Sequence, residues 1–248
     1  MMLLIDVGNS RLKWAWAEGD TFSEQISLAY GGDLAFDWFP LVASANKQPQ
    51  RVLISNVAGP RFAEALRATF TKQFGIDPEF ASVAATVAGV TCAYRDPQQL
   101  GVDRWLAVIG AWQRAKRALC IVDSGTATTV DAVDAAGAHL GGMILPGLDL
   151  MVESLFKGTS DIAQAVNSGP GSRAAIFADT TAAAVRSGAV FATAALIERA
   201  AAELEKRTGC APALYLTGGT ATRVVPSLTR AHEVVPDLVL RGLAIWGR

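Results

Sequence analysis

The chain has 248 residues, with 22 Lys and Arg against 23 Asp and Glu and a formal net charge of −1. This balance excludes the basic surface of a nucleic-acid-binding protein and a polybasic membrane patch, so we expect neither nucleic acid nor membrane as a partner. Hydrophobic residues make up 51% of the chain, and a chain of this length buries roughly 70% of its unfolded surface in one or two domains.

The residue types that most often bind metals or act as nucleophiles with a base are scarce. The chain has three cysteines, none in a Cys-x-x-Cys pair, and only two histidines. We therefore expect no disulfide framework, no structural zinc site and no serine or cysteine triad. The apolar amino terminus is interrupted at Asp6, and no run of about 18 uncharged apolar residues occurs, so we predict a cytoplasmic protein without a signal peptide or a membrane span.

The first half of the chain predicts strands followed by helices. Apolar runs over 3–7 and 12–17, separated by Gly8-Asn9-Ser10, predict two strands joined by a tight turn. A third strand is expected over 51–57. Apolar residues at helical spacing predict helices over 60–74 and 101–116, the first of them beginning with Pro60 and ending at Gly75.

The second half predicts a similar series. Strands are expected over 118–122, 129–133, 139–145 and 214–217, with a long alanine-rich helix over 179–207 and a closing helix over 237–248. The sequence does not decide whether this long helix is broken near Gly188. The small apolar residues of 182–195 fit either a subunit contact or a helix buried within the chain.

An internal repeat connects the two halves. The segment LLIDVGNSRLKW (3–14) resembles CIVDSGTATTVD (120–131), so that Asp6 aligns with Asp123 and Gly8 with Gly125. The two copies lie nearly half a chain apart, and no Pro- or Ser-rich linker separates them. We therefore predict two domains of similar fold, 1–116 and 117–248, closely packed with a cleft between them.

Each copy of the repeat is suited to phosphate. In the first, Gly8 lets a ligand approach the backbone, the amides around Asn9 and Ser10 can surround phosphate oxygens, and Asp6 can hold Mg²⁺ through its waters. A plain hairpin turn explains the first copy equally well when it is taken alone. Two such loops facing across a cleft suit a triphosphate, although the Walker and Rossmann fingerprints are absent.

Two further segments leave alternatives open. Gly218-Gly219 can let a flat ring such as adenine lie against the backbone, or can begin a helix capped by Thr217 or Thr220. Asp103 can accept a proton from a hydroxyl and Arg104 can bind a carboxylate. An acid in a first helical turn is, however, also favoured by the helix dipole alone.

Together these segments resemble the type III pantothenate kinases over most of the chain. The order and spacing of the blocks carry this resemblance: DVGNSRLKWAW (6–16), YRDPQQLGVDRW (94–105), DSGTATTVD (123–131), GGMILPGL (141–148), DTTAAAVRSG (179–188) and LTGG (216–219). The implied fold is α/β, with two ribonuclease-H-like halves in the actin-like ATPase fold of acetate and sugar kinases and an interdomain cleft. The implied reaction moves the γ-phosphate of ATP to the terminal hydroxyl of pantothenate, giving 4'-phosphopantothenate, the first step toward coenzyme A.

The resemblance also implies roles for single residues. Asp103 would be the general base, Asp6 would lie nearest Mg²⁺, and Asp123 would bind the monovalent cation, potassium or ammonium. Relatives are homodimers whose pantothenate pocket lies near the subunit interface. Ser10 stands where many relatives have Thr, which keeps the hydroxyl. ATP would contact Asp6, Val7, Gly8, Asn9, Ser10, Arg11, Leu12, Lys13 and Thr126; pantothenate would contact Tyr94, Gly101, Val102, Asp103, Arg104 and Thr180.

Two rival functions come from other classes. A different small-molecule kinase of the same superfamily, such as a sugar kinase, is disfavoured because those enzymes generally carry larger inserted domains. A nucleotide-binding regulatory protein without catalysis is disfavoured because Asp6, Asp103 and Asp123 occur together, although a fold alone does not decide function.

Overall fold

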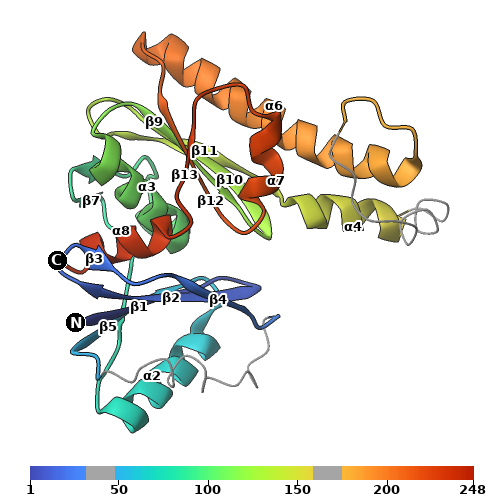
Figure 1. Cartoon of the computed structure of the whole chain (residues 1–248). Helices are drawn as coiled ribbons and strands as arrows, with labels where there is room; N and C mark the ends of the chain where they lie inside the picture. Colours follow the sequence, from blue (N-terminus) through green and yellow to red (C-terminus); the bar gives the residue numbers. More distant parts are fainter. Residues whose placement is uncertain (32–47, 159–174) are drawn as a thin grey trace. The chain divides into compact units, whose positions relative to one another are not determined.

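The computed structural model describes residues 1–31, 48–158 and 175–248 (Figure 1). It divides into two compact units, the first made of Met1–Arg114 and Asp237–Arg248 and the second of Ala115–Pro236. The closing helix therefore lies in the first unit, whereas the predicted range 117–248 placed it in the second domain. The predicted cleft between the halves stays a prediction.

The first unit is built on a sheet whose strand order is β3-β2-β1-β5-β6, with β4 also paired to β2. Its central strand β1 runs antiparallel to β2 and parallel to β5. The predicted strands over 3–7, 12–17 and 51–57 are confirmed, and the short strands were not predicted. The strands are β1 (Met2–Val7), β2 (Arg11–Glu18), β3 (Thr21–Phe22), β4 (Ile26–Ala29), β5 (Arg51–Asn56) and β6 (Glu79–Phe80), and a separate pair is formed by β7 (Thr86–Val87) and β8 (Val90–Thr91).

The two faces of this sheet carry different helices (Figure 1). Helix α2 (Pro60–Phe74) buries Phe62, Leu66 and Phe70 in one core with the odd-numbered residues of β1, because successive side chains of a strand alternate between faces. Helix α8 (Leu238–Trp246) packs against β1, β2 and β5. A Cβ at Gly247 would lie 2.3 Å from Leu53, which belongs to the face opposite α2.

Helix α3 (Val102–Ala115) follows a short 3-10 turn, η1 (Pro97–Gln99), and crosses α8 at two glycines. A Cβ at Gly242 would lie 1.8 Å from the carbonyl oxygen of Leu106, and one at Gly110 would lie 2.6 Å from that of Leu238. The missing side chains therefore let the two helices approach backbone to backbone. This packing explains why the last helix belongs to the first unit.

The second unit repeats the arrangement of the first. Its strand order is β11-β10-β9-β12-β13, and its central strand β9 runs antiparallel to β10 and parallel to β12. The predicted similarity of fold between the two copies of the repeat therefore extends to the strand pairing. The strands are β9 (Leu119–Ser124), β10 (Ala127–Val133), β11 (His139–Pro146), β12 (Ala213–Thr217) and β13 (Glu233–Val234).

The long helix of the second unit, α6 (Thr181–Thr208), continues without a break through Gly188. Ala189, Val190 and Ala194 lie in the core of this unit, which favours the interpretation as a helix buried within the chain. The other helices within the described residues are α4 (Leu148–Gly158), which was not predicted, α7 (Ala221–Val224) and the 3-10 turn η2 (Val225–Ser227). Within the described ranges no helix has the length and apolarity to cross a membrane.

Candidate active site

The turn between β1 and β2 is held by hydrogen bonds on both sides. The Gly8 amide donates to the carbonyl oxygen of Arg11 at 3.0 Å, and the Tyr30 amide donates to that of Ser10 at 3.1 Å. The Tyr30 hydroxyl donates to the Gly8 carbonyl oxygen. Burial, with the charge of Asp6, raises the pKa of Tyr30, so the phenol stays a donor. The predicted phosphate loop is thus a closed, anchored turn.

Asp6 and Lys13 face each other across the β1–β2 pair. They are register partners, and the Lys13 Nζ lies 3.7 Å from Asp6 Oδ2. The side chain of Asp6 is only 5% exposed and that of Lys13 only 15% exposed. The strand period therefore places the predicted lysine on the same face as the predicted metal ligand, at the end of β1, where ligands of α/β proteins usually bind.

The second oxygen of Asp6 has a different environment. Asp6 Oδ1 is buried, and none of the residues that the structure describes donates a hydrogen bond to it. Buried charged oxygens without a donor are costly unless a cation pairs with them. Mg²⁺ is typically held by one or two carboxylates together with waters and substrate phosphates. The residues at this turn therefore fit the Mg²⁺ expected with ATP.

The predicted pantothenate residues gather at the start of α3. The Asp103 carboxylate accepts the Arg104 amide at 2.8 Å, and a Cβ at Gly101 would lie 2.7 Å from the same oxygen. Arg104 is 6% exposed and donates to the Tyr94 hydroxyl at 3.2 Å, with its guanidinium 5.9 Å from the centre of that ring. Tyr94, Gly101, Asp103 and Arg104 thus form one cluster, and Val102 is half-buried beside it.

The turn between β9 and β10 has the same kind of closure as the first. The Gly125 amide donates to the carbonyl oxygen of Ala127 at 2.9 Å, and the Gly147 amide donates to that of Thr126 at 2.9 Å. A Cβ at Gly147 would lie 2.1 Å from the Gly125 carbonyl oxygen. Gly147 was not predicted as a site residue, although it lies within the block GGMILPGL (141–148) on which the family resemblance rests.

The Gly218-Gly219 segment packs directly on this second turn. Gly218 has φ +94°, and a Cβ there would lie 2.4 Å from Asp123 Oδ1 and 2.3 Å from the Ser124 carbonyl oxygen. The Thr220 hydroxyl bonds to Ser124 Oγ at 2.7 Å and makes no cap bond to α7. Helix α7 does begin here with Thr220 at its N-cap position, as one alternative predicted, but the Thr220 hydroxyl joins the two loops instead of capping the helix.

Two observations concern the other predicted ligands. Thr180 is exposed and its hydroxyl accepts the Ala183 amide at 3.3 Å as the N-cap of α6, so contact with pantothenate stays a prediction. In the part of the chain that the structure describes, His, Cys, Asp and Glu form no group of three or more that could hold a metal.

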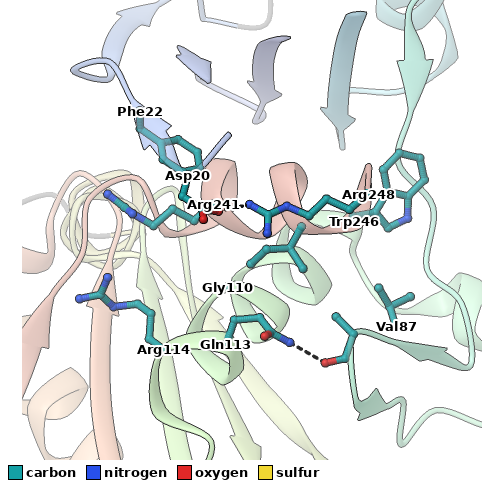
Figure 2. Close-up of a pocket in the computed structure, with 11 residues that line it drawn as sticks. Asp20, Phe22, Val87, Gly110, Gln113, Arg114, Arg241, Trp246 and Arg248 are labelled. Atoms are coloured by element: carbon teal, nitrogen blue, oxygen red, sulfur yellow. Dashed lines mark hydrogen bonds and ion pairs between the residues drawn. The ribbon is translucent and has the colours of Figure 1, made fainter. Parts of the chain in front are cut away.

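The first unit also contains a pocket of about 610 Å³ lined by α3, α8, the β2–β3 turn and the β7–β8 turn (Figure 2). Arg241 lies over the Phe22 ring, 4.8 Å from its centre, and also pairs with Asp237 at 2.8 Å. Arg248 pairs with Asp20. No predicted site residue lines this pocket, so it is a feature apart from the proposed active site.

Comparisons with known proteins decide the family. The sequence model of type III pantothenate kinase matches residues 2–203. The chain belongs to the type III pantothenate kinase family. A member from Nitrosococcus oceani is 36% identical over 249 residues, which covers 98% of this chain and 92% of the relative. The family resemblance carried by the sequence blocks is thereby confirmed.

Solved structures show the fold of this family member. A conserved protein from Campylobacter jejuni, assigned to the Baf family, has a TM-score of 0.59 at 22% identity, and the match covers 98% of this chain and 96% of that protein. A ROK family glucokinase from Streptomyces griseus, in complex with glucose and AMPPNP, has a TM-score of 0.53 at 10% identity. The match covers 98% of this chain and 97% of the glucokinase. These likenesses confirm the predicted kinase and actin-like ATPase fold.

Proposed function

We propose that this chain transfers the γ-phosphate of ATP to the terminal hydroxyl of pantothenate, giving 4'-phosphopantothenate in the first step of coenzyme A biosynthesis. Membership of the family makes it an ATP-dependent kinase. The observation that carries the assignment is the cluster of Tyr94, Asp103 and Arg104 at the start of α3. Pantothenate has a carboxylate and hydroxyls, which an arginine, a phenol and a carboxylate can bind.

The mechanism depends mainly on position and charge, as phosphoryl transfer does generally. The turn of residues 8–10 would surround the ATP phosphates with its amides, and Lys13 would add one positive charge. When bound, Mg²⁺ at Asp6 would neutralise phosphate charge. Asp103 would accept the proton of the attacking hydroxyl, and Arg104 would hold the substrate carboxylate. Thr126 would contact ATP from the second loop.

A monovalent cation, potassium or ammonium, would bind at Asp123. The half-buried Asp123 carboxylate lies beside the backbone carbonyl of Ser124, in a place that a side chain at residue 218 would fill. These are oxygen ligands, which hard cations prefer. The cation would offset part of the triphosphate charge.

We further propose a cytoplasmic homodimer. Strand β11 lies at the edge of its sheet, and both β11 and α4 expose large apolar side chains that a second copy would cover. These side chains are Leu140, Met143, Ile144, Leu150 and Leu155. Light scattering on the purified chain tests this, and a monomeric mass would contradict it.

A coupled assay for ADP release tests the catalytic proposal. Purified chain is given ATP and Mg²⁺ with pantothenate, with a panel of sugars, or with no acceptor. We expect ADP release only in the reaction that contains pantothenate. ADP release with a sugar instead would support the sugar kinase alternative. If neither pantothenate nor any sugar causes ADP release, the regulatory alternative is favoured.

A further inference from the structure

Ser55 lies beside Asp6 at the end of the neighbouring strand. The two residues are register partners in the parallel β1–β5 pair, so their side chains leave the sheet on the same face. Lys13 is the partner of Asp6 on the other side. Lys13, Asp6 and Ser55 therefore form a row across three strands, on the face opposite the core formed with α2.

The Ser55 hydroxyl is fully buried and has no hydrogen-bond partner among the described residues. Of the two Asp6 oxygens, Oδ1 is likewise buried without a hydrogen-bond partner among the described residues, whereas Oδ2 faces Lys13. Buried polar atoms are almost always hydrogen-bonded in folded proteins. Two unpaired oxygens on adjacent strands thus point to one ligand that both contact.

In the second unit the corresponding hydroxyl is hydrogen-bonded within the protein. Thr217 on β12 is the register partner of Asp123, as Ser55 is of Asp6. It too is buried, but its hydroxyl donates to the carbonyl oxygen of Pro236 at 3.2 Å. The repeat therefore keeps a hydroxyl beside each acid, bonded to the protein in one unit and uncommitted in the other.

We propose that Ser55 is a positioning residue for the divalent metal of the ATP complex: its hydroxyl hydrogen-bonds to a water of the metal that Asp6 holds. This inference rests on the proposed function, because it assumes a metal–ATP complex at the β1–β2 turn. Outer partners of this kind orient a metal and its ligands, and their loss typically lowers metal affinity about 10- to 100-fold.

The test is the affinity of Mn²⁺ for the full chain in the presence of AMPPNP, measured by electron paramagnetic resonance. In Ser55→Ala we expect the dissociation constant of Mn²⁺ to rise about 10-fold or more, while AMPPNP binding in EDTA stays unchanged. Ser55→Thr keeps the hydroxyl and should restore the affinity of the metal. A thermal unfolding scan establishes that each variant is folded at the temperature of the measurement.

The control is Thr193→Val, which removes another fully buried hydroxyl, one that donates to the Ala189 carbonyl oxygen within α6. It should leave the Mn²⁺ affinity unchanged. Unaltered Mn²⁺ affinity in Ser55→Ala, or a folded Ser55→Thr that binds as weakly as Ser55→Ala, overturns the inference. The Mn²⁺ measurement contains no pantothenate, so it tests the inference separately from the proposed function. If the expected Mn²⁺ affinities are found but the unchanged chain does not turn over pantothenate, only the proposed function is contradicted.

Discussion

Single side chains at the start of α3 owe their positions to their neighbours. The Asp103 carboxylate is turned back onto the Arg104 amide, and the absence of a side chain at residue 101 leaves room for it. The guanidinium of Arg104 is in turn held by Tyr94. A first-turn acid was expected from the helix dipole alone, but its packing beside a buried arginine adds a second reason to regard it as functional.

Replacing Asp103 by Asn should therefore affect catalysis more than binding. The amide oxygen can still accept the Arg104 amide, so the helix start should persist, but the proton acceptor is lost. We expect kcat to fall about 10²- to 10⁴-fold and the KM for ATP to change little. Steady-state kinetics with pantothenate measure both constants, and near-normal turnover in Asp103→Asn would remove the residue from the mechanism.

A second residue, Glu198, matters for stability. Burial would raise its pKa, but hydrogen bonds from Thr229 and Arg230, together with the Arg230 charge, outweigh this effect and hold the pKa below its ordinary value. The Thr229 amide lies 2.7 Å and its hydroxyl 2.9 Å from Glu198 Oε1. Since the folded pKa is lowered, this stabilisation is present above the unfolded pKa and is lost as pH falls through the folded pKa.

We expect Glu198→Gln to lower the free energy of unfolding at about pH 7 by about 1–2 kcal/mol. The difference from the unchanged protein should shrink as the pH falls below the ordinary glutamate pKa. Urea unfolding at neutral and acidic pH gives both values. A destabilisation that is equally large in acid would mean that the carboxylate charge is not its cause.

At the scale of elements, close backbone approach shapes the second loop. Gly125 and Gly147 meet at one point of the β9–β10 turn, and Gly218 at the end of β12 presses against the same turn. A Cβ at Gly147 would lie 2.1 Å from the Gly125 carbonyl oxygen, and one at Gly218 would lie 2.3 Å from that of Ser124. The segments can therefore come so close only because residues 147 and 218 have no side chain. The adenine interpretation of Gly218-Gly219 stays a prediction, whereas its packing on Asp123 is now clear.

Gly218→Ala and Gly219→Ala make a matched pair. At residue 218 an alanine would be strained at φ +94° and would overlap Asp123 Oδ1 and the Ser124 carbonyl oxygen, whereas at residue 219 it would meet nothing within 4 Å. We expect Gly218→Ala to lower the free energy of unfolding by about 1–3 kcal/mol or more and Gly219→Ala to have little effect. Equal urea midpoints for the two variants would contradict this packing argument.

At the scale of the whole molecule, the two halves share one design and differ in the acids they carry. The strand orders correspond, and each central strand ends in an acid followed by a glycine turn. In the first unit the acid pairs with Lys13, whereas its counterpart in the second unit pairs in register with Thr129. We propose that the two acids also differ in role, with Mg²⁺ at Asp6 and the monovalent cation at Asp123.

Potassium dependence tests that division of roles. We expect activity to fall when Na⁺ replaces K⁺ at constant ionic strength, and we expect Asp123→Asn to lose the response to K⁺. The ADP-release assay in both salts measures this, with Glu24→Gln as a control that removes an exposed carboxylate elsewhere. Equal activity of the unchanged chain in Na⁺ alone would contradict the role of Asp123.

The sequence by itself determined the main strands and helices, because the period of apolar residues reports locally which face is buried. It also determined the family, the repeat and the acids at each turn. It missed α4 and the short edge strands, which bury few side chains. Only the tertiary structure decided which unit holds the closing helix, where the glycines meet and that Ser55 stands beside Asp6. These three features depend on contacts between segments that are distant in sequence. The sequence does not reveal them, because strand register and close backbone approach leave no local periodic pattern of residues.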